Sequence, residues 1–266
     1  MAGDMSASPL VVDAFQAEIG ASEPWPDDVC LYQQYAAEQI TFPDYAHCLS
    51  VKTFLYMCGL DFRVEQKTNA EEMSPSGKVP FIHVGAFLVS ELDPIIAFVN
   101  ARGFSLTSNM SDTERSEMRA YMSMIESILV NAELYLAWLD DTVSTEITKP
   151  RYGCPYPWPL SWMMPLRKQK DVRARLSSNG WKDKTIEQVC EEVRTCCQAL
   201  SERLDQQPYF FGDNPTELDA LVFGHLYTVL TTSLPEGPFA EIVQKFPNLA
   251  AFCKRIDEKF FKQEQN

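Results

Sequence analysis

The spacing of apolar residues over the first hundred positions predicts short strands and two helices. Strands are expected over residues 29–33, 62–67, 79–84 and 86–89, with Gly85 joining the last two as a hairpin. A helix is expected over 45–57, where apolar residues recur every three or four positions, and a second over 93–102. Residues 69–76 are expected to form a loop.

A further short helix is expected over residues 9–19. Ser8 suits the N-cap and Pro9 suits the first helical position. Val12, Phe15 and Ile19 would share one face of this helix. That face either packs on its own domain or docks on a partner, and the pattern leaves both open.

After a polar linker over residues 105–110, the apolar pattern is helical throughout. Three capping boxes predict helix starts, because an N-cap hydroxyl is followed three positions later by an acid or amide. They are Ser111 with Glu114, Thr185 with Gln188, and Thr216 with Asp219. Helices are expected over 111–139, 186–204, 217–232, 239–245 and 248–261. Thr216 and Asp219 are predicted to be structural residues.

The order of elements predicts an α+β chain of two domains. Residues 1–104 follow the order β-α-β, loop, β-β-α of a thioredoxin-like domain, and residues 105–266 form an all-helical domain. This arrangement resembles the glutathione-transferase fold. A chain of 266 residues is long enough for two such compact units.

Charge and cysteine spacing narrow the classes of function. The net charge of −14 disfavours nucleic acid and anionic membrane as partners. Residues 1–51 contain eight acids and no Lys or Arg, the opposite of a mitochondrial presequence. No apolar run is long enough for a membrane anchor. No pair of the eight cysteines has C-x-x-C spacing, and the three histidines are scattered, so no metal site and no cofactor are predicted.

The resemblance to glutathione transferases also locates a ligand site and suggests that it is degenerate. In that family a cis proline, matched here by Pro80 after Val79, positions a backbone that pairs with glutathione. The family's acid-Ser motif holds the glutamyl carboxylate at a helix start, but here Glu91 is followed by Leu92, which has no hydroxyl. Glutathione binding is therefore not expected.

Three residues stand where transferases carry their catalytic group, namely Tyr35, Tyr45 and Cys48. Tyr45 and Cys48 lie on or beside the apolar face of the helix over 45–57, so packing is the expected role. No catalytic residue is predicted.

Segment 150–184 is rich in proline and aromatic residues and then becomes basic within an acidic chain. Trp, Tyr, Met and Arg are enriched where proteins meet. The predicted interface residues are Tyr156, Trp158, Trp162, Met163, Arg167, Lys168 and Lys170. The alternative is an ordinary packed loop followed by a solvated helix, in which Trp162 would be core.

Four stretches resemble the metaxin family more specifically. They are LYQQ at 31–34, MSPSGKVPFIHVG at 73–85, RYGCPYPWP at 151–159 and PTELDALVFGHL at 215–226. The resemblance implies a non-enzymatic protein on the cytosolic face of the mitochondrial outer membrane that serves sorting and assembly of imported β-barrel proteins. It implies indirect membrane association through an anchored metaxin-1-type partner and contact with the β-barrel assembly core. Cristae-organising and motor-adaptor complexes are further implied partners.

Two other functions remain open from the sequence. One is a glutathione-dependent transferase, and the other is a transferase-like scaffold in a cytosolic complex.

Overall fold

The computed structural model describes residues 24–36, 39, 41–234 and 237–262. A four-stranded sheet in the order β2-β1-β3-β4 forms its smaller part. The strands are β1 Cys30–Gln33, β2 Arg63–Gln66, β3 Phe81–Val84 and β4 Phe87–Ser90. β1 pairs in parallel with β2 and antiparallel with β3, and β3 pairs antiparallel with β4. The helix predicted over 9–19 lies outside the described residues.

Three helices accompany this sheet, namely α2 Asp44–Met57, α3 Ala70–Met73 and α4 Leu92–Ala101. The predicted strands and the predicted helices over 45–57 and 93–102 are confirmed to within two residues at each end. The loop predicted over 69–76 was wrong in part, because it contains the single turn of α3. A four-residue helix is too short to show an apolar period.

The larger part of the chain is helical. Its α-helices are α5 Asp112–Trp138, α6 Asp141–Val143, α7 Lys149–Gly153, α8 Leu160–Ser178, α9 Ile186–Leu204, α10 Glu217–Thr231, α11 Pro238–Gln244 and α12 Pro247–Ile256. Two π-helical turns, η1 Ser144–Thr148 and η2 Asp257–Phe261, complete it. Ser111 and Thr185 cap α5 and α9 through the predicted capping boxes.

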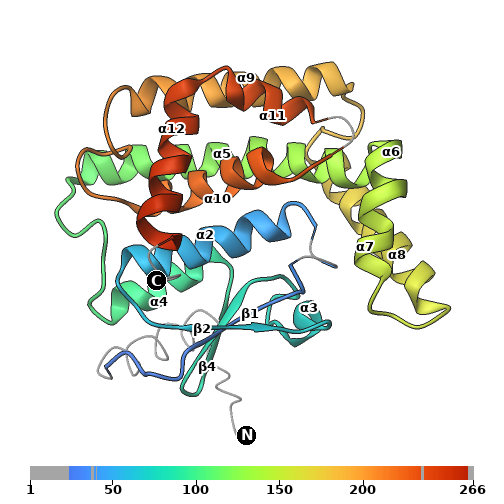
Figure 1. Ribbon diagram of the computed structural model, residues 1–266, viewed down its shortest axis with the longest axis horizontal. Helices are drawn as coiled ribbons and strands as arrows, with labels where there is room; N and C mark the ends of the chain where they lie inside the picture. The colour runs from blue at the N-terminus through green and yellow to red at the C-terminus, as the bar shows by residue number, and fades with distance from the viewer. Residues whose placement is uncertain (1–23, 37–38, 40, 235–236, 263–266) are drawn as a thin grey trace, which may run out of the picture.

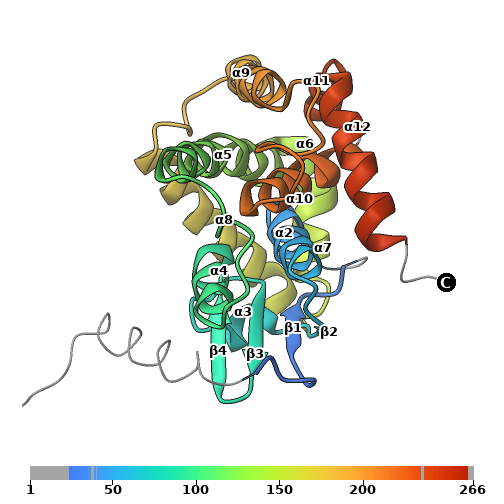
Figure 2. The same ribbon diagram turned by 90° about the vertical axis from the view of Figure 1, so that its left-hand side faces the viewer.

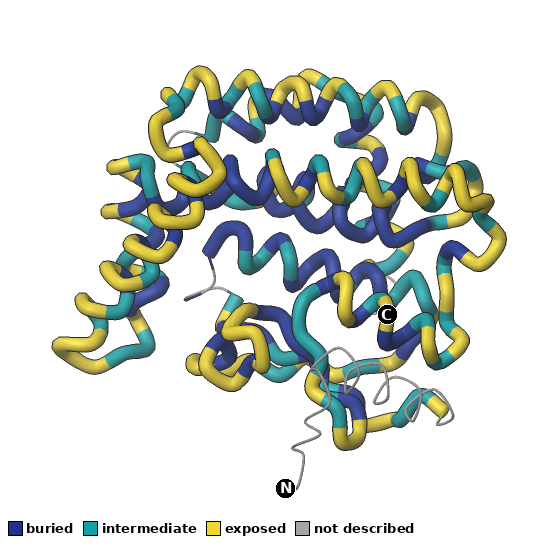
Figure 3. Tube along the Cα trace, turned by 180° about the vertical axis from the view of Figure 1, so that it is seen from behind, coloured by how far each residue is buried: buried dark blue, intermediate teal, exposed yellow. Residues whose placement is uncertain are grey.

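The elements form layers above the sheet. Figures 1 and 2 show α2 lying over the sheet, α10 and α5 above α2, and α9 as the outermost layer. Nearly every residue of α10 is buried, because other helices surround it. In Figure 3 α2 and α10 are the darkest, most buried part of the trace, whereas the projecting end of α7 and α8 is largely exposed. No helix among the described residues is both long and apolar enough to cross a membrane.

The two parts of the fold meet most closely where α2 crosses α10. A Cβ atom placed on Gly224 would lie 2.0 Å from the Ser50 hydroxyl oxygen and 2.6 Å from the Ala46 carbonyl oxygen. Glycine is therefore required at this point of α10, since any side chain would push α2 away. The Ser50 hydroxyl donates to the Ala46 carbonyl oxygen at 2.9 Å, and it lies 3.4 Å from the Leu221 carbonyl oxygen. The second contact links α2 to α10.

Candidate functional site

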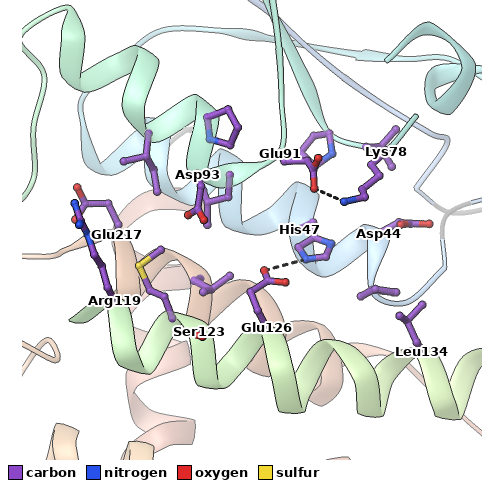
Figure 4. Close-up of a pocket in the computed structure, with 18 of the residues that line it drawn as sticks. Asp44, His47, Lys78, Glu91, Asp93, Arg119, Ser123, Glu126, Leu134 and Glu217 are labelled. Carbon is purple, nitrogen blue, oxygen red and sulfur yellow. Dashed lines mark hydrogen bonds and ion pairs between the residues drawn. The ribbon is translucent and has the colours of Figure 1, made fainter. Parts of the chain in front are cut away.

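A cleft of about 1000 Å³ opens between the sheet part and the helical part of the chain. Its walls are the start of α2, the loop before β3, the start of α4, and one face each of α5, α8 and α10. Figure 4 shows charged side chains converging on it from several elements. Those labelled there are Asp44, His47, Lys78, Glu91, Asp93, Arg119, Glu126 and Glu217.

The residues of the predicted degenerate glutathione site do gather at this cleft. Val79, Pro80, Glu91 and Leu92 all line it, and the Val79–Pro80 peptide bond is cis as predicted. Glu91 caps α4 with φ of 69°, a left-handed conformation that a non-glycine residue adopts at a cost. The Lys78 ammonium forms an ion pair with the Glu91 carboxylate across the mouth of the site.

The chemistry at the start of α4 does not suit an anionic ligand. Leu92 is buried, and it offers no hydroxyl to a carboxylate. Asp93 follows in the first turn, and burial, together with the neighbouring Glu126 and Glu91, raises its pKa. A glutamyl carboxylate placed here would therefore lack a side-chain donor and would meet acidic neighbours. The backbone N–H groups of a helix start are the remaining attraction.

None of the three candidate catalytic residues lines this cleft. Cys48 is fully buried, and burial raises the pKa of its thiol, which keeps it protonated. Burial likewise raises the pKa of the Tyr45 hydroxyl, with Cys48 as a second cause. Tyr35 is 42% exposed and lies two residues after the end of β1. The packing role expected for Cys48 agrees with its burial.

The histidines correct the sequence analysis. His47 and His225 are 178 positions apart in the chain, yet their rings lie 5.2 Å apart and perpendicular to each other. Glu126 completes a group in which one ligand atom of each residue lies within 4.8 Å of the others. The prediction of scattered histidines was wrong, because the crossing of α2 and α10 brings these two together. His83 lies apart from them on β3.

Each histidine of this group has a carboxylate partner from α5. His47 Nε2 lies 3.5 Å from Glu126 Oε1, the pair drawn in Figure 4. Burial alone would lower the pKa of His47, but Glu126 and the acids beyond it raise it. Burial opposes the ionisation of Glu126, whereas its bond to His47 lowers its pKa to about 2. His225 Nδ1 lies 2.8 and 3.0 Å from the two oxygens of Glu133.

The predicted structural residues Thr216 and Asp219 form the capping box of α10. The backbone N–H and the hydroxyl of Thr216 both donate to Asp219 Oδ2 at 2.7 Å, and the N–H of Phe210 donates to Oδ1 at 3.0 Å. Burial raises the pKa of Asp219 to about 6, against the opposing effect of these hydrogen bonds. Its carboxylate therefore holds the incoming chain on the start of α10.

The predicted interface residues divide into two groups. Trp158 is 86% exposed, Trp162 is 67% exposed and Met163 is 49% exposed, so the alternative that Trp162 is core was wrong. Arg167 and Lys170 are exposed beside them on α8. We call residues 158–167, which comprise the end of the loop after α7 and the first turns of α8, the projecting end of α7 and α8; Lys170 follows it in the middle of α8.

Lys168 and Tyr156 make contacts within the chain instead. The Lys168 ammonium forms an ion pair with Glu71 of α3, which the Tyr152 hydroxyl also contacts at 2.7 Å. The Tyr156 hydroxyl donates to Glu72 at 2.9 Å. Sequence reasoning missed Glu71 and Tyr152, because nothing local connects residues so far apart in the chain. Burial alone would lower the pKa of Lys168, but Asp44 and Glu71 raise it.

Comparison with known proteins agrees with this fold. A glutathione S-transferase N-terminal domain family matches residues 46–143, and a glutathione S-transferase C-terminal domain family matches residues 193–256. Among solved structures, a beta-etherase from Sphingobium has a TM-score of 0.57 at 17% identity, covering 88% of this chain and 99% of that one. A glutathione transferase family member from Pseudomonas fluorescens has a TM-score of 0.56 at 14% identity, covering 95% and 96%.

The similarity in sequence is much closer to another group of proteins. Human metaxin-2 is 52% identical over 252 residues, which is 95% of this chain and 96% of the relative. The metaxin-2 homologue of Caenorhabditis elegans is 40% identical over 84% of this chain and 95% of its own length. Mouse metaxin-1 is 28% identical over 81% of this chain and 70% of its own length. A chain that matches these relatives over nearly its whole length, and that has a transferase-like fold, belongs to the metaxin family.

Proposed function

We propose that the chain is a non-enzymatic subunit of a mitochondrial outer-membrane complex that sorts and assembles imported β-barrel proteins. It would be bound peripherally on the cytosolic face through an anchored metaxin-1-type partner. The observation that carries this proposal is the match to metaxin-2 over 95% of the chain. The absence of a hydroxyl at Leu92 and the protonated, buried Cys48 support the non-enzymatic part of the proposal.

The projecting end of α7 and α8 is the surface we propose for docking. Besides Trp158, Trp162 and Met163, it exposes Leu160 and Leu166, so a single segment presents most of the large apolar side chains found exposed among the described residues. Exposed apolar surface of this kind, flanked by cations such as Arg167 and Lys170, marks a site of protein or membrane contact.

Binding of purified variants to outer-membrane vesicles that carry the anchored partner tests the docking surface. Trp162→Ala should weaken binding by about 2 kcal/mol, or roughly 30-fold, because a central aromatic residue is lost. Leu88→Ala is the matched control, since Leu88 is also an apolar side chain, 50% exposed, but lies on β4 in the sheet part of the chain. Equal effects of the two variants would contradict the assignment of this surface.

Charge at the same surface should act differently. Lys170→Glu should cost about 1 kcal/mol or less, and only this loss should shrink as salt is added, because exposed charges are screened. Lys168 is unsuitable for the test, because it is bound to Glu71 inside the chain.

Cell fractionation tests the location. The protein should sediment with mitochondria and be released by carbonate extraction. Its retention in the carbonate pellet of cells that lack the metaxin-1-type partner would contradict peripheral binding.

A further inference from the structure

The group formed by His47, Glu126 and His225 has a feature that packing alone does not explain. Nε2 of His225 is fully buried, and it has no hydrogen-bond partner among the described residues. A buried polar atom without a partner costs free energy, so it points to something that would occupy the adjoining space. His47 and Glu126, the other two residues of the group, both line the cleft.

Glu133 decides which nitrogen of His225 is available. Both oxygens of this buried carboxylate face Nδ1, and a carboxylate can only accept, so Nδ1 carries the hydrogen. In the neutral ring Nε2 then holds a lone pair. A carboxylate that fixes the far nitrogen of an imidazole is the usual second partner of a metal-bound histidine, and it also raises the basicity of the ligand.

The three ligand atoms suit a borderline divalent metal. Two imidazoles and one carboxylate form a His₂Glu set, which is a known zinc combination that leaves a fourth position open. Zinc bonds of 2.0–2.2 Å place tetrahedral ligand atoms about 3.3 Å apart. His47 Nε2 and Glu126 Oε1 are already 3.5 Å apart, and one ring nitrogen of His225 completes a set of ligand atoms that all lie within 4.8 Å of one another. Side-chain movements that shorten the longer separations by up to about 1.5 Å would close the site.

We propose that His47, Glu126 and His225 bind Zn²⁺, with Glu133 orienting His225 and with the fourth coordination position facing the cleft. The cation would use the lone pair of Nε2, and it would compensate the negative charges of Glu126 and Glu133. The competing account is a purely structural network, in which both rings are held by the two glutamates and no metal enters.

Titration of the metal-stripped full-length protein with Zn²⁺, against a chromophoric chelator, distinguishes these accounts. Glu133→Gln should weaken binding about 10- to 100-fold, the range for residues that orient a metal-bound histidine. Glu126→Gln should weaken it at least as much, because it removes a ligand. Equal Zn²⁺ affinity of the unmodified protein and Glu126→Gln would overturn the proposal.

Glu117→Gln is the matched control for Glu126→Gln. Glu117 lies on the same helix with 43% of its side chain exposed, compared with 47% for Glu126, and it does not line the cleft. This variant should keep the affinity of the unmodified protein. A loss as large as that of Glu126→Gln would show that the effect is one of general charge and would also overturn the site.

The absorption spectrum of the protein loaded with Co²⁺ instead of Zn²⁺ tests whether any of the eight cysteine thiols binds the metal. Nitrogen and oxygen ligands should give visible d–d bands without the near-ultraviolet charge transfer of a cobalt thiolate. The d–d bands should disappear in the His47→Gln variant. The His47 side chain is partly exposed, so we expect this variant to fold, and its thermal melting without metal checks that it does. Thiolate bands, or d–d bands unchanged in folded His47→Gln, would contradict the assignment. A negative result in this test would not affect the proposed function in the outer-membrane complex, which rests on the match to metaxin-2.

Discussion

At the residue scale, the side chains at the start of α4 are the reason for our prediction that glutathione does not bind this cleft. The cis bond before Pro80 and the left-handed Glu91 both lie at the cleft. Leu92 replaces the hydroxyl donor expected in a transferase, and Lys78 already neutralises Glu91. We therefore expect these side chains, rather than the backbone, to disfavour glutathione.

Glutathione should bind the unmodified protein with a dissociation constant above about 1 mM, as measured by isothermal titration calorimetry. Leu92→Ser should restore weak binding at most. A single hydrogen bond to a charged group is worth about 1.5 to 3 kcal/mol, and Asp93 and Glu126 remain beside the ligand. Leu88→Ser on β4 controls for the added hydroxyl. A sub-millimolar constant for the unmodified protein would contradict the loss of the site.

Asp219 should make stability depend on pH. Its pKa of about 6 in the folded state exceeds its ordinary value of 3.8, so the folded protein binds more protons than the unfolded chain between these values. Its contribution to the free energy of unfolding should therefore fall as the pH rises from 4 to 6, by up to about 3 kcal/mol for a shift of this size.

Urea unfolding of the unmodified protein and of Asp219→Asn at several pH values isolates this contribution. The difference in unfolding free energy between them should change across this window and be constant above it. A constant difference throughout would show that the carboxylate ionises normally in the fold.

At the element scale, the contact between α2 and α10 controls both packing and the histidine group. Gly224 lets the two helices approach, and the next residue in α10 is His225, while His47 lies between the Ala46 and Ser50 contacts on α2. The same crossing thus joins the two parts of the fold and assembles the candidate metal ligands.

Gly224→Ala should lower the free energy of unfolding by about 1 to 3 kcal/mol, because overpacking outweighs the better helix propensity of alanine. Gly237→Ala is the control, since a Cβ there meets nothing closer than 3.8 Å. Thermal and urea unfolding measure both variants. Equal stability of Gly224→Ala and the unmodified protein would mean that α2 can move away freely.

The sequence predicted elements better than it predicted contacts between them. A capping box such as Ser111 with Glu114 involves residues within one helical turn, so it can be recognised from neighbouring residues in the sequence. The apolar periods of strands and helices can be recognised in the same way. The proximity of His47 and His225 depends on how α2 and α10 cross, and the apolar period of either helix does not predict that crossing. Lys168 looked like one member of a basic surface, because charge is visible in the sequence while its partner Glu71 is 97 positions away.

At the scale of the whole molecule, α8 is linked to the sheet part through α3. Lys168 contacts the buried Glu71 and lies 5.7 Å from the centre of the Tyr152 ring. We propose a division into two domains at residue 104, and the ion pair between Lys168 and Glu71 would then join the two domains.

Lys168→Met should lower the free energy of unfolding by about 2 to 3 kcal/mol, because it leaves the buried Glu71 carboxylate without its cation. The loss is smaller than for a fully buried ion pair, because Lys168 is partly exposed. The double variant Lys168→Met, Glu71→Gln should recover part of this loss, with a coupling of at least about 0.5 kcal/mol in a double-mutant cycle. Lys170→Met, at the exposed position two residues later, should change little. Additive effects of the two substitutions would show that the ion pair contributes nothing.

The crossing of α2 and α10 also has a consequence for synthesis. Ser50 and Leu221, which meet there, are 171 positions apart in the chain. A ribosome adding 5 to 20 residues per second needs about 10 to 30 s to make the chain between them. During that interval the face of α2 that packs on α10 has no partner. The thioredoxin-like part therefore emerges with this face of α2 uncovered, and we expect the nascent chain to need a chaperone during that interval.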